Sequence, residues 1–329
     1  MRISSLTYFT ASLPSMQDNQ SQIARLSEQI SSGQRMLSAK DDPLSAEKAM
    51  QLSSRIAVRD QYLANQQKAG LALDYENTIL TAMDKTLTDA RALLTQSNGG
   101  DTQPVRDQHA EMLKNMYQQL KDLANNRDTE GHFIFAGFNT QLGSANPPFQ
   151  HTQVYPAIAA SGSTNYIGTP YGSLTNPQGV RSINVDNGRS VQVSDNLDSV
   201  LNAGLNGGVA TGSTTDVLQA LDQIAITLHD TSLTTTQVDT AVNTAMNALT
   251  ATLDRMGGIE RRVAAATLEV NDVKKTTDSL QLLEQNSLSD LTQVDKAAAI
   301  IEMQSRQTSL QAAQQAYAQT SKLSLFSYM

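Results

Sequence analysis

Chemistry requires reactive side chains at particular spacings, and this chain offers few candidates. Its histidines (His109, His132, His151 and His229) lie far apart in the sequence, and none belongs to an HExxH or HxxxH pattern. The sequence has no cysteine, so it can supply no thiolate for a metal or for nucleophilic attack. The histidines are therefore interpreted as surface or loop residues rather than as metal ligands.

Three short motifs could suggest catalysis or ligand binding, and each has a simpler interpretation. Asp41 and Asp42 form a carboxylate pair, but Pro43 follows them directly, which is typical of a helix start with Asp42 as the N-cap. The glycines at 204–208 lack the strand and helix that flank a nucleotide-binding loop. Residues 186–188 lack the further acidic ligands of a calcium loop. The sequence thus predicts no enzyme and no catalytic, cofactor-binding or metal site.

Composition excludes two further classes of protein. The net charge is −8 and no block is rich in Lys or Arg, which argues against a nucleic-acid partner. No apolar run approaches the roughly 20 residues that span a bilayer, and the first residues contain no apolar core of a Sec-type signal peptide. We therefore expect a soluble protein with neither a nucleic-acid nor a membrane partner.

The last third of the chain predicts a long helix. No Gly or Pro occurs after Ile259, and residues 268–323 as one helix would measure about 84 Å. Steps of three and four residues give a coiled-coil seam. The seam consists of Val270, Val273, Thr277, Leu280, Glu284, Ser287, Leu291, Val294, Ala298 and Ile301. A break is expected just before this rod, at Gly257 and Gly258.

The first 130 residues predict helices that can accompany the C-terminal rod. One helix ends near Ser31–Gly33, a second runs from Pro43 to about Thr95, and Pro104 opens a third after a turn at 98–100. The second helix would measure about 80 Å. Its length nearly matches that of the C-terminal rod, which favours side-by-side packing.

Residues 138–215 differ sharply in composition from the helices around them. They contain ten of the 18 glycines and five of the eight prolines, which predicts a β-rich insert. Its clearest element is a hairpin from Ile183 to Val193 around Asn187-Gly188. Helical periodicity returns near Asp216, and a further helix is expected from about Gln237.

The predicted fold is mainly α with a β-rich insert. Long N- and C-terminal helices pack as an antiparallel coiled-coil or helical-bundle rod, and the insert forms an outer β domain. The predicted domains are the terminal helices (1–40 and 290–329), the helical rod (41–137 and 216–289) and the outer domain (138–215). The outermost turns contain few large apolar residues, so burial within one chain offsets little ordering entropy. The terminal helices are therefore expected to be mobile in the monomer and ordered on assembly.

The candidate functional residues are consequently assembly residues rather than catalytic ones. They are the large or apolar positions of the two terminal helices: Met16, Ile23, Leu26, Ile30, Leu291, Val294, Ala298, Ile301, Leu310, Tyr317, Leu323 and Phe326. Asp42 and Pro43 complete the set as the helix cap. The charge-poor stretch 303–322 fits either a polar tail that frays or a helix packed on all sides in an assembly.

Three segments resemble the flagellin superfamily. Residues 26–43 (LSEQISSGQRMLSAKDDP) resemble its N-terminal signature, and residues 126–140 (NRDTEGHFIFAGFNT) resemble its junction between helix and outer domain. Residues 307–329 (QTSLQAAQQAYAQTSKLSLFSYM) resemble the C-terminal end of the hook-associated members that form the hook–filament junction. The start Met-Arg-Ile-Ser, Pro43 after the aspartate pair and the end Leu-Phe-Ser-Tyr-Met differ from the flagellins themselves.

The resemblance implies a structural subunit of the extracellular bacterial flagellum, exported by the flagellar type III system. It implies a ring of copies between the first hook-associated protein and flagellin, and a cytoplasmic export chaperone that covers the C-terminal helix. Two alternatives stay open. One is a flagellin that polymerises into the filament itself, and the other is a coiled-coil surface adhesin whose insert binds a ligand.

Overall fold

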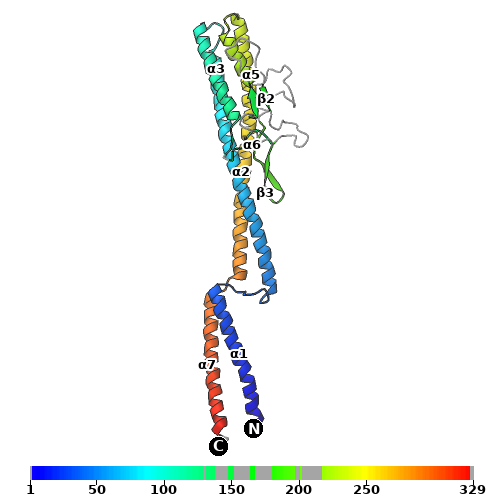
Figure 1. Cartoon of the computed structure of the whole chain (residues 1–329), viewed down its shortest axis with the longest axis vertical. Helices are drawn as coiled ribbons and strands as arrows, with labels where there is room; N and C mark the ends of the chain where they lie inside the picture. Colours follow the sequence, from blue (N-terminus) through cyan, green and yellow to red (C-terminus); the bar gives the residue numbers. More distant parts are fainter. Residues whose placement is uncertain are drawn as a thin grey trace. The chain divides into compact units, whose positions relative to one another are not determined.

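The computed structural model describes residues 2–128, 130–137, 147–151, 164–166, 180–196, 201 and 217–326 (Figure 1). The helices are α1 (Arg2–Ser32), α2 (Pro43–Gln96), α3 (Gln103–Ala124), α5 (Val217–His229), α6 (Thr235–Thr292) and α7 (Lys296–Phe326). The strands are β1 (Phe149–His151), β2 (Thr164–Tyr166), β3 (Ser182–Asp186) and β4 (Arg189–Gln192). The described residues therefore confirm a mainly α fold with a small β region. None of the described helices is long and apolar enough to cross a membrane.

The chain forms two compact units. Unit 1 comprises residues 1–60 and 278–329, and unit 2 comprises residues 61–277. The long helices α2 and α6 contribute to both units, whereas α1 and α7 belong to unit 1 alone.

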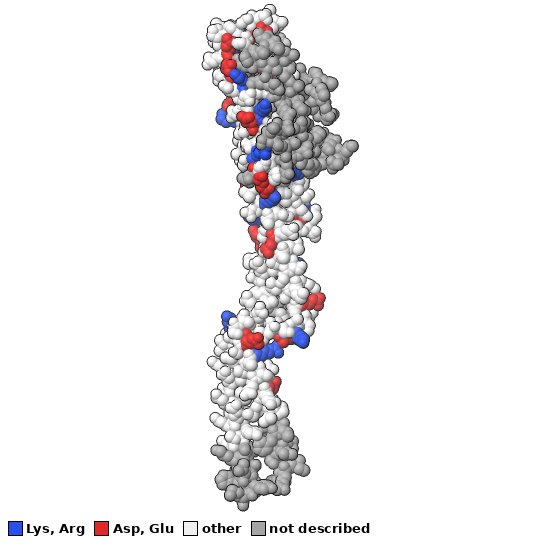
Figure 2. All heavy atoms as spheres, viewed as in Figure 1, with Lys and Arg blue, Asp and Glu red and all other residues white. Residues whose placement is uncertain are grey.

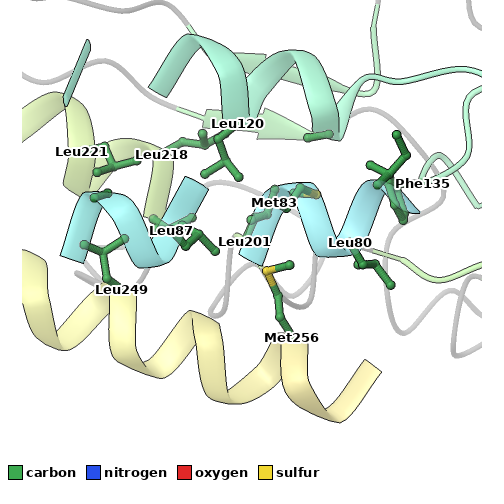
Figure 3. Packing of buried hydrophobic residues seen from close by; sticks show 14 of the residues in the cluster. Leu80, Met83, Leu87, Leu120, Phe135, Leu201, Leu218, Leu221, Leu249 and Met256 are labelled. Carbon is green, nitrogen blue, oxygen red and sulfur yellow. The ribbon is translucent and has the colours of Figure 1, made fainter. Parts of the chain in front are cut away.

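Unit 2 contains the hydrophobic core. Most of its large buried side chains come from α2, α3, α5 and α6, and Figure 3 shows how they pack together. Labelled there are Leu80, Met83, Leu87, Leu120, Phe135, Leu201, Leu218, Leu221, Leu249 and Met256. Burying such side chains contributes roughly 1.5–3 kcal/mol each, which makes this packing the main source of stability in unit 2.

The expected helix break at Gly257 and Gly258 is wrong, because α6 passes through both glycines. A glycine within a helix costs up to about 1 kcal/mol. The core side chains Met256 and Val263 flank the pair on the same helix and are buried. Packing on either side thus keeps this part of α6 helical in spite of the two glycines.

The predicted hairpin is confirmed. Strands β3 and β4 pair antiparallel, with Ile183 opposite Val191, and Gly188 takes the positive φ of 73° that the turn requires. Val185 and Val191 of this hairpin are buried in the core of unit 2. Strands β1 and β2 form a second antiparallel pair. Beyond these strands and the hairpin turn, the structure describes only residues 147–148, 180–181, 193–196 and 201 of the predicted insert.

The prediction of one uninterrupted rod over 268–323 is also wrong. Helix α6 ends at Thr292 and α7 begins at Lys296. The seam predicted for the rod holds for Val270, Val273, Thr277 and Glu284, which are all buried. Asp295 then starts the new helix, because its Oδ1 accepts hydrogen bonds from the backbone N–H groups of Ala297 and Ala298 at 3.0 and 3.1 Å.

Candidate functional site: the joint and the exposed apolar surface of unit 1

The carboxylate pair Asp41–Asp42 has a structural role. The backbone N–H of Ser45 donates to Asp42 Oδ1 at 3.1 Å, and α2 begins at Pro43, which confirms Asp42 as its N-cap. The hydrogen bonds to Ser45 and the nearby Arg35 guanidinium lower the pKa of Asp42. Asp41 Oδ2 accepts the backbone N–H groups of Leu37 and Ser38, both at 3.0 Å. Asp42 therefore binds the backbone in the first turn of α2, and Asp41 binds the backbone of the segment that precedes it.

Asp42→Ala is expected to fray the first turn of α2, because the N–H of Ser45 loses its acceptor. Hydrogen exchange at Ser45 should become faster, while exchange in the core of unit 2 stays unchanged. Asp42→Asn keeps an acceptor oxygen and should retain most of the protection. Because the pKa of Asp42 is lowered on folding, its contribution to stability is lost as the pH falls through that pKa. Unchanged exchange at Ser45 in Asp42→Ala would contradict the capping role.

The described histidine side chains belong to separate local contacts. His109 Nδ1 lies 2.8 Å from Ser97 Oγ, and His229 Nδ1 lies 2.8 Å from Asp107 Oδ1. His132 lies near Asp128 and Glu130, at 3.8 and 3.6 Å. Nothing is described of the side chain of His151. Among the described residues, no group of three or more His, Asp or Glu side chains could hold a metal ion.

The two breaks in unit 1, residues 33–42 and 293–295, lie side by side, and we call them the paired joint. Backbone hydrogen bonds join them, from Arg35 N to the oxygen of Thr292 at 2.8 Å and from Val294 N to the oxygen of Gly33 at 3.1 Å. The side chain of Arg35 adds a bond to the oxygen of Leu291 at 3.2 Å. Gly33 has a φ of 73°, which favours glycine at the end of α1. The paired joint thus interrupts both chain segments at the same place.

Helices α1 and α7 contact each other in unit 1. Of their described side chains, only Leu26 and Ala299 are buried. Seven predicted assembly residues of unit 1 are partly buried: Met16, Ile23, Ile30, Leu291, Val294, Leu310 and Tyr317. Leu323 and Phe326 lie in the last turns of α7, and nothing is described of their side chains. Part of the predicted set is thus at least partly buried in the single chain.

Ala298 and Ile301 do not belong to this partly buried set, because both are exposed in the single chain. The side of α7 that is least exposed instead carries Ala299, Met303, Arg306, Leu310, Ala313 and Tyr317. These positions also follow steps of four and three, so the sequence contains their signal. The predicted seam continued the register of α6 past the break, whereas the stripe of α7 begins one residue later, at Ala299, and continues at Met303 instead of Ile301.

A charged contact within unit 1 was not predicted. Arg59 Nε and Nη2 donate to the carboxylate of Glu284 at 2.7 and 3.2 Å, and Arg55 Nε lies 3.6 Å from it. The hydrogen bonds and charge of Arg59 lower the pKa of Glu284. This pair fastens the first part of α2 to the last part of α6.

Unit 1 also exposes most of the large apolar side chains that face solvent in the described part of the chain. They are Leu13, Leu44, Met50, Val58, Leu280, Leu282, Leu283, Ile300 and Ile301. In unit 2, which has more residues, the corresponding set is Leu71, Val105, Met112 and Leu268. Charged side chains are sparse on the described surface of α7 (Figure 2), and residues 307–319 contain none. A surface of this kind is typical of helices that bind other protein chains.

Comparison with known proteins links this architecture to the bacterial flagellum. Residues 3–140 match the bacterial flagellin N-terminal helical region. The chain is 25% identical to flagellar hook-associated protein 3 of Escherichia coli over 338 aligned positions, which cover 99% of each protein.

Solved structures share the fold. One, from Vibrio parahaemolyticus and assigned to the flagellar hook-associated proteins, is 18% identical, with a TM-score of 0.63 over 77% of this chain and 100% of that one. The flagellar junction protein FlgL of Legionella pneumophila is 14% identical, with a TM-score of 0.54 over 74% of this chain and 99% of that one. The chain is therefore similar to flagellar hook-associated protein 3 over nearly its whole length, and its residues 3–140 match the bacterial flagellin N-terminal helical region.

Proposed function

We propose that this chain is a structural subunit that joins the hook of the bacterial flagellum to its filament, and that it is not an enzyme. The likeness to hook-associated protein 3 over nearly the whole chain supports this role. The observation that carries it is the concentration of exposed apolar side chains on unit 1. A protein that works alone gains nothing from such a surface, whereas a subunit buries it against neighbouring chains.

The proposed partners follow from this position in the flagellum. Unit 1 would contact further copies of the chain in a ring, the first hook-associated protein on the hook side and flagellin on the filament side. The protein would reach this extracellular site through the flagellar type III export system. A cytoplasmic chaperone that covers α7 before export is consistent with the exposed apolar residues at its start, Ile300 and Ile301.

The test compares one exposed apolar side chain of unit 1 with a matched one of unit 2. Ile301 is 68% exposed and Leu268 is 66% exposed, so either can become Ser at a cost of at most about 0.5 kcal/mol in stability. In a strain that lacks the native chain, Ile301→Ser should sharply reduce the number of filaments. Flagellin should then appear in the medium. Leu268→Ser should support normal filaments.

The readouts are filament counts by electron microscopy, secreted flagellin by immunoblot and the melting midpoint of each purified variant. Equal filament counts for the two variants, at equal secreted amounts, would contradict an assembly role for the start of α7. Filament loss with the Leu268→Ser control alone would assign the assembly surface to unit 2.

A flagellin that forms the filament itself is the second candidate, favoured by the match of residues 3–140 to the flagellin N-terminal region. Addition of the purified chain to filament seeds separates the two functions. A junction subunit should add a short cap and then stop, whereas a flagellin should extend the seeds continuously.

A further inference from the structure

A carboxylate of α2 lies in the interior of unit 2. The side chain of Glu76 is 0% exposed, and neither of its oxygens has a hydrogen-bond partner among the described residues. The nearest cationic atom is Nη2 of Arg262 on α6, at 3.7 Å from Oε2. An ionised carboxylate in such a place loses its hydration without a close ion pair to replace it.

A second carboxylate occupies the stronger position on the same guanidinium. Asp195, in the segment that follows β4, forms a close ion pair with Nη2 of Arg262. Its Oδ1 also accepts a hydrogen bond from Gln192 Nε2 at 2.7 Å. One guanidinium atom therefore faces two carboxylates and contacts only Asp195 closely. When two carboxylates lie close together with little hydration, their negative charges repel each other, which favours protonation of one of them.

The charged groups around Glu76 indicate which carboxylate holds the proton. Burial, followed by the negative charge of Asp195, raises the pKa of Glu76 to about 8, against the opposing effects of the Arg262 charge, the backbone N–H of Asp195 and the Arg181 charge. Burial also raises the pKa of Asp195, although Arg262 and Gln192 oppose this change. Burial without a close ion pair thus favours the proton on Glu76, whereas the close ion pair with Arg262 favours the charged form of Asp195.

The cluster joins the β segment to the long helices. Asp195 follows Val193, whose N–H donates to the oxygen of Arg181 at 2.9 Å. Glu76 and Arg262 belong to α2 and α6. Nearby, Gln66 Nε2 donates to the oxygen of Val185 at 2.8 Å, which also fastens β3 to α2. The segment 193–196 thus rests on the helix pair through a buried charge cluster.

We propose that Glu76, Asp195 and Arg262 form a proton-dependent clasp, which holds segment 193–196 on α2 and α6 while Glu76 is protonated and weakens when Glu76 ionises. Opening of the clasp lets water reach both carboxylates. This opening would release the β segment locally, without unfolding of the helical core. The clasp does not depend on the function proposed above.

The direction of the pH effect follows from proton linkage. The pKa of Glu76 rises on folding from 4.5 to about 8, so the closed clasp retains a proton that the open state releases. Clasp stability is greatest below pH 4.5 and falls as the pH rises to about 8. The lowered pKa values of Asp107 and Glu284 affect stability only in acid. The window from pH 6 to pH 8 therefore isolates the clasp from these groups.

Hydrogen exchange at Val193 in the full-length chain tests the clasp. In the wild type, protection of this amide should fall at least about tenfold between pH 6 and pH 8, after correction for intrinsic exchange. Glu76→Gln has the same shape without a titratable proton, so its protection at Val193 should be nearly equal at the two pH values. Amides in the middle of α2 should respond little in either protein.

A matched control uses a second ion pair, which joins the β3–β4 hairpin to α6. Glu269 pairs with Arg189 at 3.1 Å, and both side chains are exposed. Glu269→Gln should therefore keep the pH response of the wild type. An equal pH response in Glu76→Gln and wild type would overturn the proposal, as would a wild type without any response.

A direct titration covers the case in which Glu76→Gln does not fold. Carbon-13 NMR of the wild-type chain follows the Glu76 carboxyl itself. A midpoint above pH 7 would support the clasp, and a midpoint below pH 5.5 would overturn it.

Discussion

Removal of residues 307–329 is expected to abolish the hook–filament junction while it leaves the melting midpoint of unit 2 nearly unchanged. Every residue of the hydrophobic core cluster lies between Ala69 and Val273, so the deletion removes none of them. Within α1 and α7, only Leu26 and Ala299 are buried among the described side chains. The deleted segment therefore adds little to the stability of the single chain, and its value lies in contacts with neighbouring subunits.

The same argument predicts weak hydrogen-exchange protection of the C-terminal helix before assembly. Backbone ordering costs about 1–2 kcal/mol per residue, and the half-buried stripe of α7 offsets little of this cost. Amides between Gln304 and Lys322 should exchange rapidly in the isolated chain and slowly in isolated hook–filament preparations. Strong protection in the isolated chain would show that one copy suffices to order α7. A large drop in the melting midpoint after removal of residues 307–329 would also show that one copy suffices to order α7.

Gly99→Ala is expected to destabilise unit 2 by about 3 kcal/mol or more. A Cβ at this position would lie 2.2 Å from the oxygen of Thr235 and 2.6 Å from its Cα, and these backbone atoms begin α6. The N–H of Gly99 also donates to Asp239 Oδ1 at 2.7 Å. The added methyl group would force the turn away from α6 and break this hydrogen bond. Chemical denaturation of the purified chain measures the loss.

Gly70→Ala serves as the matched control. A Cβ at Gly70 would meet nothing within 4 Å, and the residue lies inside α2, where alanine favours the helix by roughly 1 kcal/mol. This variant should be slightly more stable than the wild type. If the two variants have equal stability, the close approach of Gly99 to Thr235 is not a constraint in solution.

Local signals in the sequence were sufficient wherever neighbouring residues decide the structure. Asp42 and Pro43 predicted the start of α2, because an acceptor and a residue without an N–H suit the first turn of a helix. Asn187 and Gly188 predicted the turn between β3 and β4, because that turn needs a positive φ. Both features depend on contacts within a few residues.

Predictions were wrong where partners distant in the sequence decide the structure. No Gly or Pro lies near residues 293–295 in the sequence, yet the backbone of Gly33 and Arg35 pairs with this segment and the helix is interrupted there. Conversely, two glycines predicted a break at 257–258, and core packing keeps the helix intact there. Each error reflects tertiary contacts that outweigh local propensity.

In the candidate site too, the sequence predicted features that depend on neighbouring residues and missed those that depend on distant contacts. Leu26 was predicted as an assembly residue from its helical stripe, and its side chain is buried in the single chain. The exposure of Ile301 depends on the register shift at the break. The cluster of Glu76, Asp195 and Arg262 unites three segments that no sequence spacing connects.

The paired joint has a mechanical consequence for any load on unit 1. Two chain segments cross the joint, and the hydrogen bonds of Arg35 to Leu291 and Thr292 tie them together. A pull on α1 is therefore shared with the segment that leads into α7, so neither connection carries the load alone. Separation of the two segments requires the loss of several parallel hydrogen bonds at once. A single extended linker without such bonds would stretch under the same tension.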